Sequence, residues 1–421
     1  MELNKYVLLN FLIIITCGAK SFAQAVYVPN DPEYNAQWHL GSNSGINAGV
    51  GWTFSQGDNV VIAILDTGVD PHPDLVNNTL PGYDFVDNDT YTGEHICWNE
   101  NIRSSVVVDN FHGTHVAGVA AAVTNNNTGG AGVAFDAKIL PVRVLDGCGQ
   151  GEEEKIIKGI RWAIGQPVAG VATNPNPAKV INLSLGSKQP CNANYQSAID
   201  DAIFAGTTVV VSAGNSTQEA ADFSPANCSG VISVAASDEN KLLTYFSNFG
   251  NGVDITAPGE FIRSTYNSQD VGTLNDYSIL SGTSQAAPQV SGVAALLYSV
   301  DPSLAPWEIK EIIQDSAQAI TCPKGCGAGL LDASAAVGLA SETVINSTGS
   351  YGNFIGNGCS WILQSNYYVT IENLYCGSEF IANRVRHSGG CSLSTSVAYK
   401  KVGTCSSNAW SDNYKIVQKS D

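Results

Sequence analysis

The segment SGTSQAAPQVSGVAALLYS, residues 281–299, is the stretch from which the fold and chemistry of this chain are best inferred. A Gly-Thr-Ser turn leads directly into a long apolar helical pattern, so the hydroxyl of Ser284 is expected at a helix N-terminus. The N–H groups of a first helical turn lack acceptors within the helix, and with the helix dipole they stabilise negative charge on a bound oxygen. Ser284 is therefore a candidate nucleophile for acyl transfer.

A serine nucleophile needs an imidazole to take its proton and a carboxylate to orient that imidazole. The β-branched run 59–65 stops at Asp66, and in open α/β sheets ligand sites lie beyond the carboxyl ends of the strands. His112 opens the helix-like segment HGTHVAGVAAAV and is the candidate base. His115, three residues further on, would point into the packing, so we interpret it as structural.

Five segments resemble the signature segments of the subtilisin-like serine proteases (peptidase S8), and they follow that family's order. They are AILDTGVDPHPDL (63–75), HGTHVAG (112–118), INLSLGS (181–187), VVVSAGN (209–215) and SGTSQAAPQV (281–290). The similarity covers about residues 27–340 and is closest to the secreted bacterial branch. It implies a serine endopeptidase that works through an acyl-enzyme intermediate.

Carried over by position, the resemblance implies Ser284 as nucleophile, His112 as general base and then acid, and Asp66 as the orienting carboxylate. Asn215 matches the family's oxyanion donor. An extended polypeptide substrate would add as a strand to two backbone edges, with a further residue helping to wall the primary specificity pocket. These substrate-binding residues are Ser184, Leu185 and Gly186 on one edge, Gly149, Gln150 and Gly151 on the other, and Gly214 at the pocket.

Two departures from the family pattern leave an alternative open. Gln285 and Gln289 stand where Met and His are usual, and no propeptide-like stretch separates residue 23 from the mature-like start at Tyr27. A catalytically impaired, secreted relative with a binding or structural role therefore remains open. An aspartic protease is a weaker alternative, because Asp66-Thr67-Gly68 has no second Asp-Thr-Gly or Asp-Ser-Gly to share a proton with.

The resemblance also implies structural calcium, with loops like those of thermitase. In VTNNNTGG (123–130) the side chain of Asn126 and several backbone carbonyls would supply the oxygens that Ca²⁺ prefers. The ligands of this first site would be Val123, Asn126, Thr128 and Gly130, closed by Asp31 and Asp74. A second, weaker site is expected in DFVDNDT, at Asp84, Asp87 and Asp89.

Composition restricts the compartment and the partners. The first 23 residues, with Lys5, an apolar stretch and the small-residue end Ser21-Phe22-Ala23, have the pattern of a secretory signal peptide. The 421-residue chain carries a net charge of −18, which disfavours nucleic acid and anionic membranes as partners. We expect a secreted, extracellular protein that is a monomer.

Eleven cysteines, less Cys17 in the signal segment, leave an even number that suits an oxidising compartment. Spacing alone does not fix their connectivity. The resemblance implies three pairs, Cys97 with Cys148, Cys191 with Cys228, and Cys322 with Cys326, and leaves four cysteines to pair among themselves, namely Cys359, Cys376, Cys391 and Cys405.

Alternation of strand-like and helical runs predicts an α/β fold with a mostly parallel sheet covered by helices on both faces. The strand-like runs are at about 60–65, 138–144, 179–185, 207–213 and 230–236, with a helix over 284–299 crossing the centre of the sheet. This catalytic domain would span 24–343. Short β-prone runs after it predict a small, disulfide-rich β module of unknown role at 350–421.

Overall fold

The computed structural model describes residues 26–95, 97, 111–268 and 273–348, together with short strands between residues 367 and 418. The expected signal peptide, 1–23, lies outside the described residues. In the part of the chain that is described, no helix has the length and apolar character needed to cross a bilayer.

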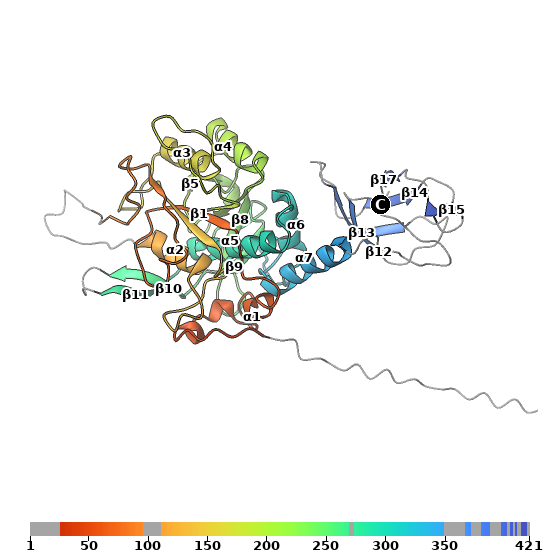
Figure 1. Cartoon of the computed structure of the whole chain (residues 1–421), viewed down its shortest axis with the longest axis horizontal. Helices are drawn as coiled ribbons and strands as arrows, with labels where there is room; N and C mark the ends of the chain where they lie inside the picture. Colours follow the sequence, from red (N-terminus) through yellow and green to blue (C-terminus); the bar gives the residue numbers. More distant parts are fainter. Residues whose placement is uncertain are drawn as a thin grey trace, which may run out of the picture.

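A seven-stranded sheet forms the centre of the fold, and every neighbouring pair of its strands is parallel (Figure 1). Its order is β2 (Tyr83–Asp84), β3 (Lys138–Arg143), β1 (Val61–Asp66), β4 (Val180–Leu183), β6 (Thr208–Ser212), β8 (Ile232–Ser237) and β9 (Ile255–Pro258). The five predicted strands correspond to β1, β3, β4, β6 and β8. The parallel sheet predicted from the sequence is confirmed.

Helices cover both faces of this sheet. In β1, Ile62 and Ile64 belong to one buried cluster, whereas Ala63 and Leu65 belong to the other. This alternation follows from the two-residue period of a strand. The first cluster includes residues of α2 (His112–Ala121) and α5 (Thr283–Val300), and the second includes residues of α3 (Glu153–Ala163) and α4 (Ala193–Phe204). Figure 1 shows α3 and α4 on the opposite side of β1 from α2.

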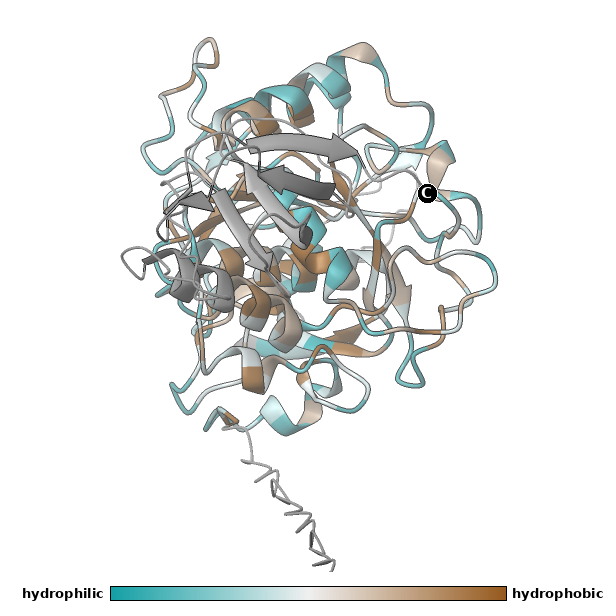
Figure 2. Cartoon of the chain, turned by 90° about the vertical axis from the view of Figure 1, so that its right-hand side faces the viewer, coloured by the Kyte–Doolittle hydropathy of each residue, from teal (hydrophilic) through white to brown (hydrophobic). Residues whose placement is uncertain are grey.

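Helix α5 is buried along most of its length and packs against the central strands, as the sequence predicted. It also contacts α2 and two later helices, α6 (Pro306–Asp315) and α7 (Ala333–Thr348). Apolar residues, brown in Figure 2, concentrate in this interior, while hydrophilic residues lie on the outer loops and helix faces. Among the other elements are α1 (Ala48–Gly51), the antiparallel pair β10 (Ile262–Ser268) and β11 (Thr273–Leu280), and the short pair β5 (Ser187–Lys188) and β7 (Phe223–Ser224).

The C-terminal strands are antiparallel, in keeping with the β module expected there. They form one sheet of β12 (Tyr367–Ile371), β13 (Phe380–His387), β14 (Val397–Lys401) and β17 (Tyr414–Gln418), and a separate pair of β15 (Cys405–Ser406) and β16 (Ala409–Trp410). Cys359, Cys376 and Cys391 lie outside the described residues, so pairing in this region stays a prediction, as does the boundary at 350.

Two of the implied disulfides are formed and one is not. The structure joins Cys97 to Cys148 and Cys191 to Cys228. Cys322 and Cys326 are instead free thiols, so the expectation of a third pair is not met. Burial, followed by the neighbouring thiol of Cys322, raises the pKa of Cys326.

Candidate active site

A cleft of about 330 Å³ lies at the carboxyl ends of the central strands, and it brings together residues far apart in the sequence. His112 from the start of α2, Ser284 from the start of α5 and Asn215 after β6 all line it. Asp66, at the end of β1, lies buried behind His112. The four residues predicted from three separate motifs and a strand end thus converge on one site.

Asp66 and His112 form a close hydrogen-bonded pair. The distance between Asp66 Oδ1 and His112 Nδ1 is 2.7 Å, and the Asp66 carboxylate is fully buried. Burial lowers the pKa of His112, but the charge of Asp66 and its hydrogen bond outweigh burial and raise it above the usual value. This contact fixes the Nδ1–H tautomer and leaves Nε2 free to accept a proton.

Ser284 is tied to the end of β4. Its Oγ donates to the carbonyl oxygen of Ser184 at 3.3 Å, and the Ser184 hydroxyl donates back to the Ser284 carbonyl at 2.9 Å. The Ser284 hydroxyl is thus directed at Ser184 rather than at His112. Catalytic hydrogen bonds are often long or misaligned without substrate, so this geometry is compatible with Ser284 as the nucleophile.

Asn215 is oriented by the residue before the nucleophile. Its Oδ1 accepts hydrogen bonds from the backbone N–H of Thr283 at 2.9 Å and from the Thr283 hydroxyl at 3.0 Å. Because the amide oxygen is held there, the Nδ2 group is left to donate elsewhere. A Cβ atom added to Gly282 would lie 3.3 Å from Nδ2, which puts this donor beside the turn that carries Ser284.

Five of the seven predicted substrate-binding residues lie in the cleft. Ser184, Leu185, Gly186, Gly149 and Gly214 line the cleft, whereas Gln150 and Gly151 are not among its lining residues. The other lining residues were not predicted as site residues, and they are Thr67, Leu145, Cys148, Ser212, Ser216 and Phe223. Of these, only Thr67 and Ser212 lie in the motifs that resemble the family, so only these two could have been predicted from the sequence.

Three neighbouring polar residues are structural. His115 is buried and its Nε2 contacts the carbonyl oxygens of Ile262 at 3.0 Å and Ser278 at 3.3 Å. Burial lowers its pKa to about 3, so the ring is neutral. Gln285 and Gln289 are also buried and do not line the cleft. They therefore do not narrow the space in which a substrate would bind.

A family model for the subtilases matches residues 57–334, which contain every element of the cleft. The chain belongs to the subtilase family. An extracellular protease of Xanthomonas campestris is 42% identical over 335 residues, and the match covers 74% of this chain and 57% of that protein. The chain thus spans little more than half of that relative's length.

Other subtilases support the same assignment. Thermitase of Thermoactinomyces vulgaris is 40% identical over 296 residues, covering 70% of this chain and 93% of thermitase. A solved structure of a protease from Pseudoalteromonas arctica aligns with a TM-score of 0.70 at 41% identity, covering 74% of this chain and 99% of that one. The subtilase fold of the parallel sheet and its helices is therefore established.

The loop proposed for calcium lies against both expected aspartates. Asp31 accepts from the backbone N–H groups of Asn125 and Asn126 at 2.8 and 3.1 Å. Asp74 accepts from the Asn126 side chain at 2.7 Å and from the Gly130 N–H at 3.2 Å. Within the described part of the chain, no cationic side chain forms an ion pair with either aspartate.

This arrangement fits a bound cation. Two buried carboxylates satisfied only by neutral donors are a site where positive charge is stabilising. The Asn126 Oδ1 accepts from the Thr128 N–H at 2.8 Å, so the Asn126 side chain would have to turn to present this oxygen to a cation beside Asp74. Backbone carbonyls of Val123, Thr128 and Gly130 would complete the oxygen set expected from the sequence.

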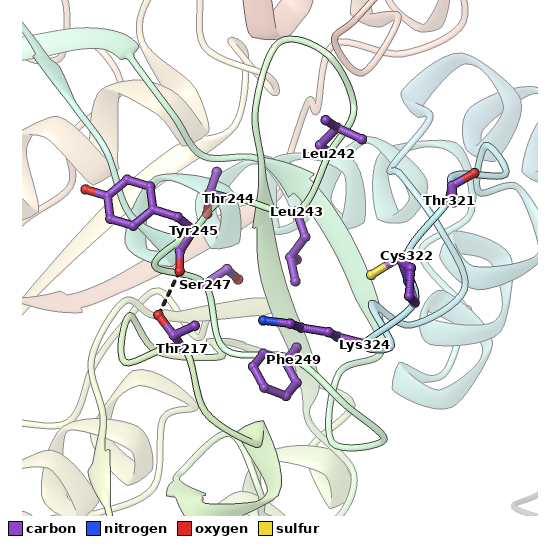
Figure 3. Close-up of a pocket in the computed structure, with 11 residues that line it drawn as sticks. Thr217, Leu242, Leu243, Thr244, Tyr245, Ser247, Phe249, Thr321, Cys322 and Lys324 are labelled. Carbon is purple, nitrogen blue, oxygen red and sulfur yellow. Dashed lines mark hydrogen bonds between the residues drawn. The ribbon is translucent and has the colours of Figure 1, made fainter.

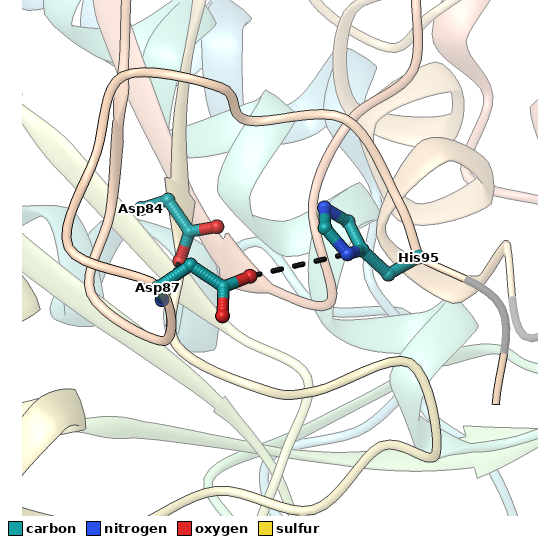
Figure 4. Close-up of side chains that lie close together, drawn as sticks. All are labelled: Asp84, Asp87 and His95. Carbon is teal, nitrogen blue, oxygen red and sulfur yellow. Dashed lines mark hydrogen bonds and ion pairs between the residues drawn. The ribbon is translucent and has the colours of Figure 1, made fainter. Parts of the chain in front are cut away.

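In the second acidic segment, Asp84 and Asp87 are paired with an arginine. The buried guanidinium of Arg143 lies 2.5 Å from Asp84 Oδ2 and 2.6 Å from Asp87 Oδ2. His95 Nδ1 lies 3.9 Å from Asp87, as the dashed line in Figure 4 shows. Asp89 instead accepts from the Tyr91 N–H at 2.8 Å. Arg143 already supplies the positive charge here, so a calcium ion would compete with it, and the second site stays a prediction.

A second groove, of about 320 Å³, shares no lining residue with the catalytic cleft (Figure 3). Lys324 Nζ lies 4.8 Å from the centre of the Phe249 ring, a cation–π contact. The Thr217 hydroxyl donates to the Tyr245 carbonyl oxygen at 2.7 Å. Cys322, one of the two free thiols, also lines this groove, away from Ser284.

Proposed function

We propose that this subtilase is a secreted serine endopeptidase that hydrolyses polypeptides through an acyl-enzyme intermediate. The observation that carries the proposal is the 2.7 Å contact between His112 and Asp66 in the same cleft as Ser284. A buried carboxylate that orients an imidazole beside a serine at a helix N-terminus is the arrangement that activates a hydroxyl for acyl transfer.

In the first step, His112 Nε2 takes the proton of Ser284 while Oγ attacks the peptide carbonyl carbon. Asp66 stays ionised and stabilises the imidazolium that forms. His112 then gives this proton to the leaving amine, and the amine departs with the C-terminal part of the substrate. A water molecule attacks the resulting ester with His112 again as base, which regenerates the Ser284 hydroxyl and releases the carboxylic acid product.

The negative charge on the attacked oxygen needs donors that are already in position. Asn215 Nδ2 is one, because its amide oxygen is held by Thr283. The backbone N–H of Ser284, in the first turn of α5, is the second candidate, since such N–H groups have no acceptor within the helix. The positive end of the helix dipole points to the same oxygen.

Polypeptides are the substrate class that best fits the cleft. Ser184–Gly186 and Gly149 line the cleft beside the catalytic residues, and backbone edges of this kind pair with an extended chain. Gly149 has a φ of 74°, a conformation that favours glycine and that shapes the second edge. The Cys97–Cys148 disulfide links that edge to the loop after β2.

The competing functions have less support. The side chains of Gln285 and Gln289 are buried in the protein interior and do not line the cleft. They therefore give no steric reason for an inactive protein. An aspartic protease would need a second carboxyl group next to Asp66 in the cleft. Instead Asp66 is hydrogen bonded to His112, and no aspartate or glutamate lines the cleft within the described residues.

Secretion is supported by the closed disulfides, since such bonds persist in oxidising compartments. Extracellular proteases are among the chain's relatives, from Xanthomonas campestris and Dichelobacter nodosus. We further propose one structural calcium ion, held by Asp31, Asp74 and the 123–130 loop. It would fix this loop against the N-terminal segment and take no part in the chemistry.

Digestion of an unfolded protein substrate tests the proposed function. Mass spectrometry of the products should reveal internal cleavage with new amino termini, and none with the Ser284→Ala variant. Asn215→Ala should lower kcat by about 10² to 10³, the loss measured for such a donor in subtilisin, with little change in KM. Products that are identical with wild type and Ser284→Ala would refute the proposal.

A further inference from the structure

Glu94 is a buried acidic residue next to the catalytic pair that the mechanism above does not use. It is 5% exposed and does not line the cleft. Its Oε2 accepts a hydrogen bond from the Thr67 hydroxyl at 2.8 Å, and its Oε1 accepts from the backbone N–H of Thr114 at 2.7 Å. Burying an acidic group is costly unless its hydrogen bonds are satisfied, so these two contacts account for its position.

The contact between Glu94 and Thr114 is at the N-terminus of α2, the helix that begins at His112. Phe111, which precedes the helix, gives no side-chain cap. The orphan donors of the first turn are satisfied from elsewhere, because Gly113 N–H donates to Thr67 Oγ1 at 3.0 Å and Thr114 N–H donates to Glu94. Glu94 and Thr67 together therefore cap the turn that carries His112.

The contact between Glu94 and Thr67 connects Glu94 to Asp66, because Thr67 is hydrogen bonded to Asp66. Thr67 donates its N–H to Asp66 Oδ1 at 2.8 Å, and its hydroxyl lies 3.2 Å from the same oxygen. That oxygen is the one bonded to His112 Nδ1. The Thr67 hydroxyl has one proton, so it donates either to Glu94 or to Asp66, while the Thr67 N–H keeps the link to Asp66 in both cases.

The segment that carries Glu94 is itself held firmly. The Glu94 N–H donates to Asp70 Oδ1 at 2.7 Å, and the other Asp70 oxygen accepts from the Asn267 side chain at 2.6 Å. The close approach of α2 to this region requires glycine at position 113, since a Cβ there would lie 2.0 Å from the Gly68 carbonyl oxygen. Glu94 is therefore fixed relative to both partners.

We propose that Glu94 is a positioning residue, which holds the first turn of α2 and the Thr67 side chain together and so keeps His112 and Asp66 in hydrogen-bonding geometry. This inference rests on the proposed function, in which that geometry activates Ser284. Burial raises the pKa of Glu94 well above its usual range. Either protonation state keeps the contact with Thr67, because a carboxylate accepts from the hydroxyl and a carboxylic acid donates to it.

Substitution of Glu94 with two readouts tests this role. Glu94→Ala should lower kcat by about 10-fold or more and change KM less than about twofold, because only the alignment of the catalytic pair is disturbed. The low-field NMR resonance of the His112 Nδ1 proton, measured on the resting protein, should shift or broaden. Glu94→Gln should return kcat to within about threefold of wild type, since its amide can accept from Thr114 N–H and donate to Thr67.

Glu308→Ala is the matched control, because Glu308 is also a buried glutamate that caps a helix N-terminus, accepting from the Ala305 N–H at 2.9 Å. It should lower the melting temperature and leave both kcat and the His112 resonance unchanged. Wild-type kcat and an unshifted resonance in Glu94→Ala would overturn the proposal. Failure of Glu94→Gln to restore kcat would also overturn it.

Two further measurements cover the remaining cases. If Glu94→Ala does not fold, Thr67→Val removes the shared hydroxyl at nearly constant shape, and an unchanged kcat in that variant would overturn the proposal. If the wild type cleaves no peptide, the proposed function fails, but the His112 resonance still decides the positioning role. A resonance that moves in Glu94→Ala supports it, and one that does not move contradicts it.

Discussion

Ser184 and Ser284, one hundred residues apart, are joined by two reciprocal hydrogen bonds, from each hydroxyl to the other residue's carbonyl oxygen. The Ser184 hydroxyl also accepts from the Asn182 side chain at 2.9 Å, and Asn182 Oδ1 accepts from Ser291 of α5 at 2.9 Å. Strand β4 and the residue after it are thus hydrogen bonded to helix α5 in two places, at Ser284 and at Ser291. The connection sets where the nucleophile stands relative to a substrate edge.

Removal of the Ser184 hydroxyl should therefore affect both stability and catalysis. Ser184→Ala leaves the buried Asn182 amide without its acceptor, so we expect a loss of about 1 to 3 kcal/mol in the free energy of unfolding. We also expect kcat to fall several-fold. Ser316→Ala, which removes a hydroxyl-to-carbonyl bond at the end of α6, is the control and should leave kcat unchanged. Equal kcat values for the two variants would show that the Ser184 link does not position the nucleophile.

The activity should fall at acid pH, with a midpoint above that of an unperturbed imidazole. His112 acts as a base only when neutral, and its pKa is raised because the charge and hydrogen bond of Asp66 outweigh burial. As the pH falls through this raised pKa, the imidazole becomes protonated and kcat/KM decreases. A profile of kcat/KM against pH measures the midpoint. Asp66→Asn should move it downward and lower kcat by about 10⁴, and an unmoved midpoint would argue against this assignment.

Gln285 should make the activity insensitive to peroxide. Methionine beside a nucleophile is open to oxidation, whereas an amide is not, and the chain's only methionine is Met1. Residual activity after timed exposure to dilute peroxide should stay constant in the wild type and decay in Gln285→Met. The free thiol of Cys322 lies in the second groove, so its oxidation should not affect turnover. Equal decay of both proteins would be incompatible with this explanation.

Removal of calcium should lower the melting temperature. An ion that binds only the folded state at about 100 times its Kd adds about 2.7 kcal/mol of stability, which corresponds to roughly 5 °C for a domain of this size. A chelator should produce this decrease in the wild type. It should have no effect on Asp74→Asn, whereas the exposed control Asp222→Asn should respond like wild type. If a chelator leaves the wild-type melting temperature unchanged, the calcium proposal is wrong.

The parallel sheet and the convergence of the three candidate catalytic residues could be predicted because their signals are local. The run before Asp66 and the turn before Ser284 each show in a few consecutive residues where a side chain stands relative to a strand end or a helix start. Glu94 carries no such signal. It is an isolated acidic residue in a polar stretch, and its importance comes only from contacts with Thr67 and Thr114 across the fold.

Other contacts in the structure were also not predicted from the sequence motifs. The charge of Asp84 and Asp87 is met by Arg143, which comes from a neighbouring strand more than fifty residues later. Nothing in DFVDNDT indicates that a guanidinium rather than a calcium ion would be its partner. Likewise, the resemblance implied a bond between Cys322 and Cys326, but the thiol contact in the structure shows only that the two sulfurs are neighbours.

Covalent labelling tests the central claim most directly. A fluorophosphonate reacts with a serine only where an imidazole activates the hydroxyl and donors stabilise the oxyanion. One adduct per chain, located by peptide mapping at Ser284, absent in Ser284→Ala and strongly slowed in His112→Ala, is the result we predict. Labelling that is undiminished in Ser284→Ala, or absent from the folded wild-type protein, would contradict this account.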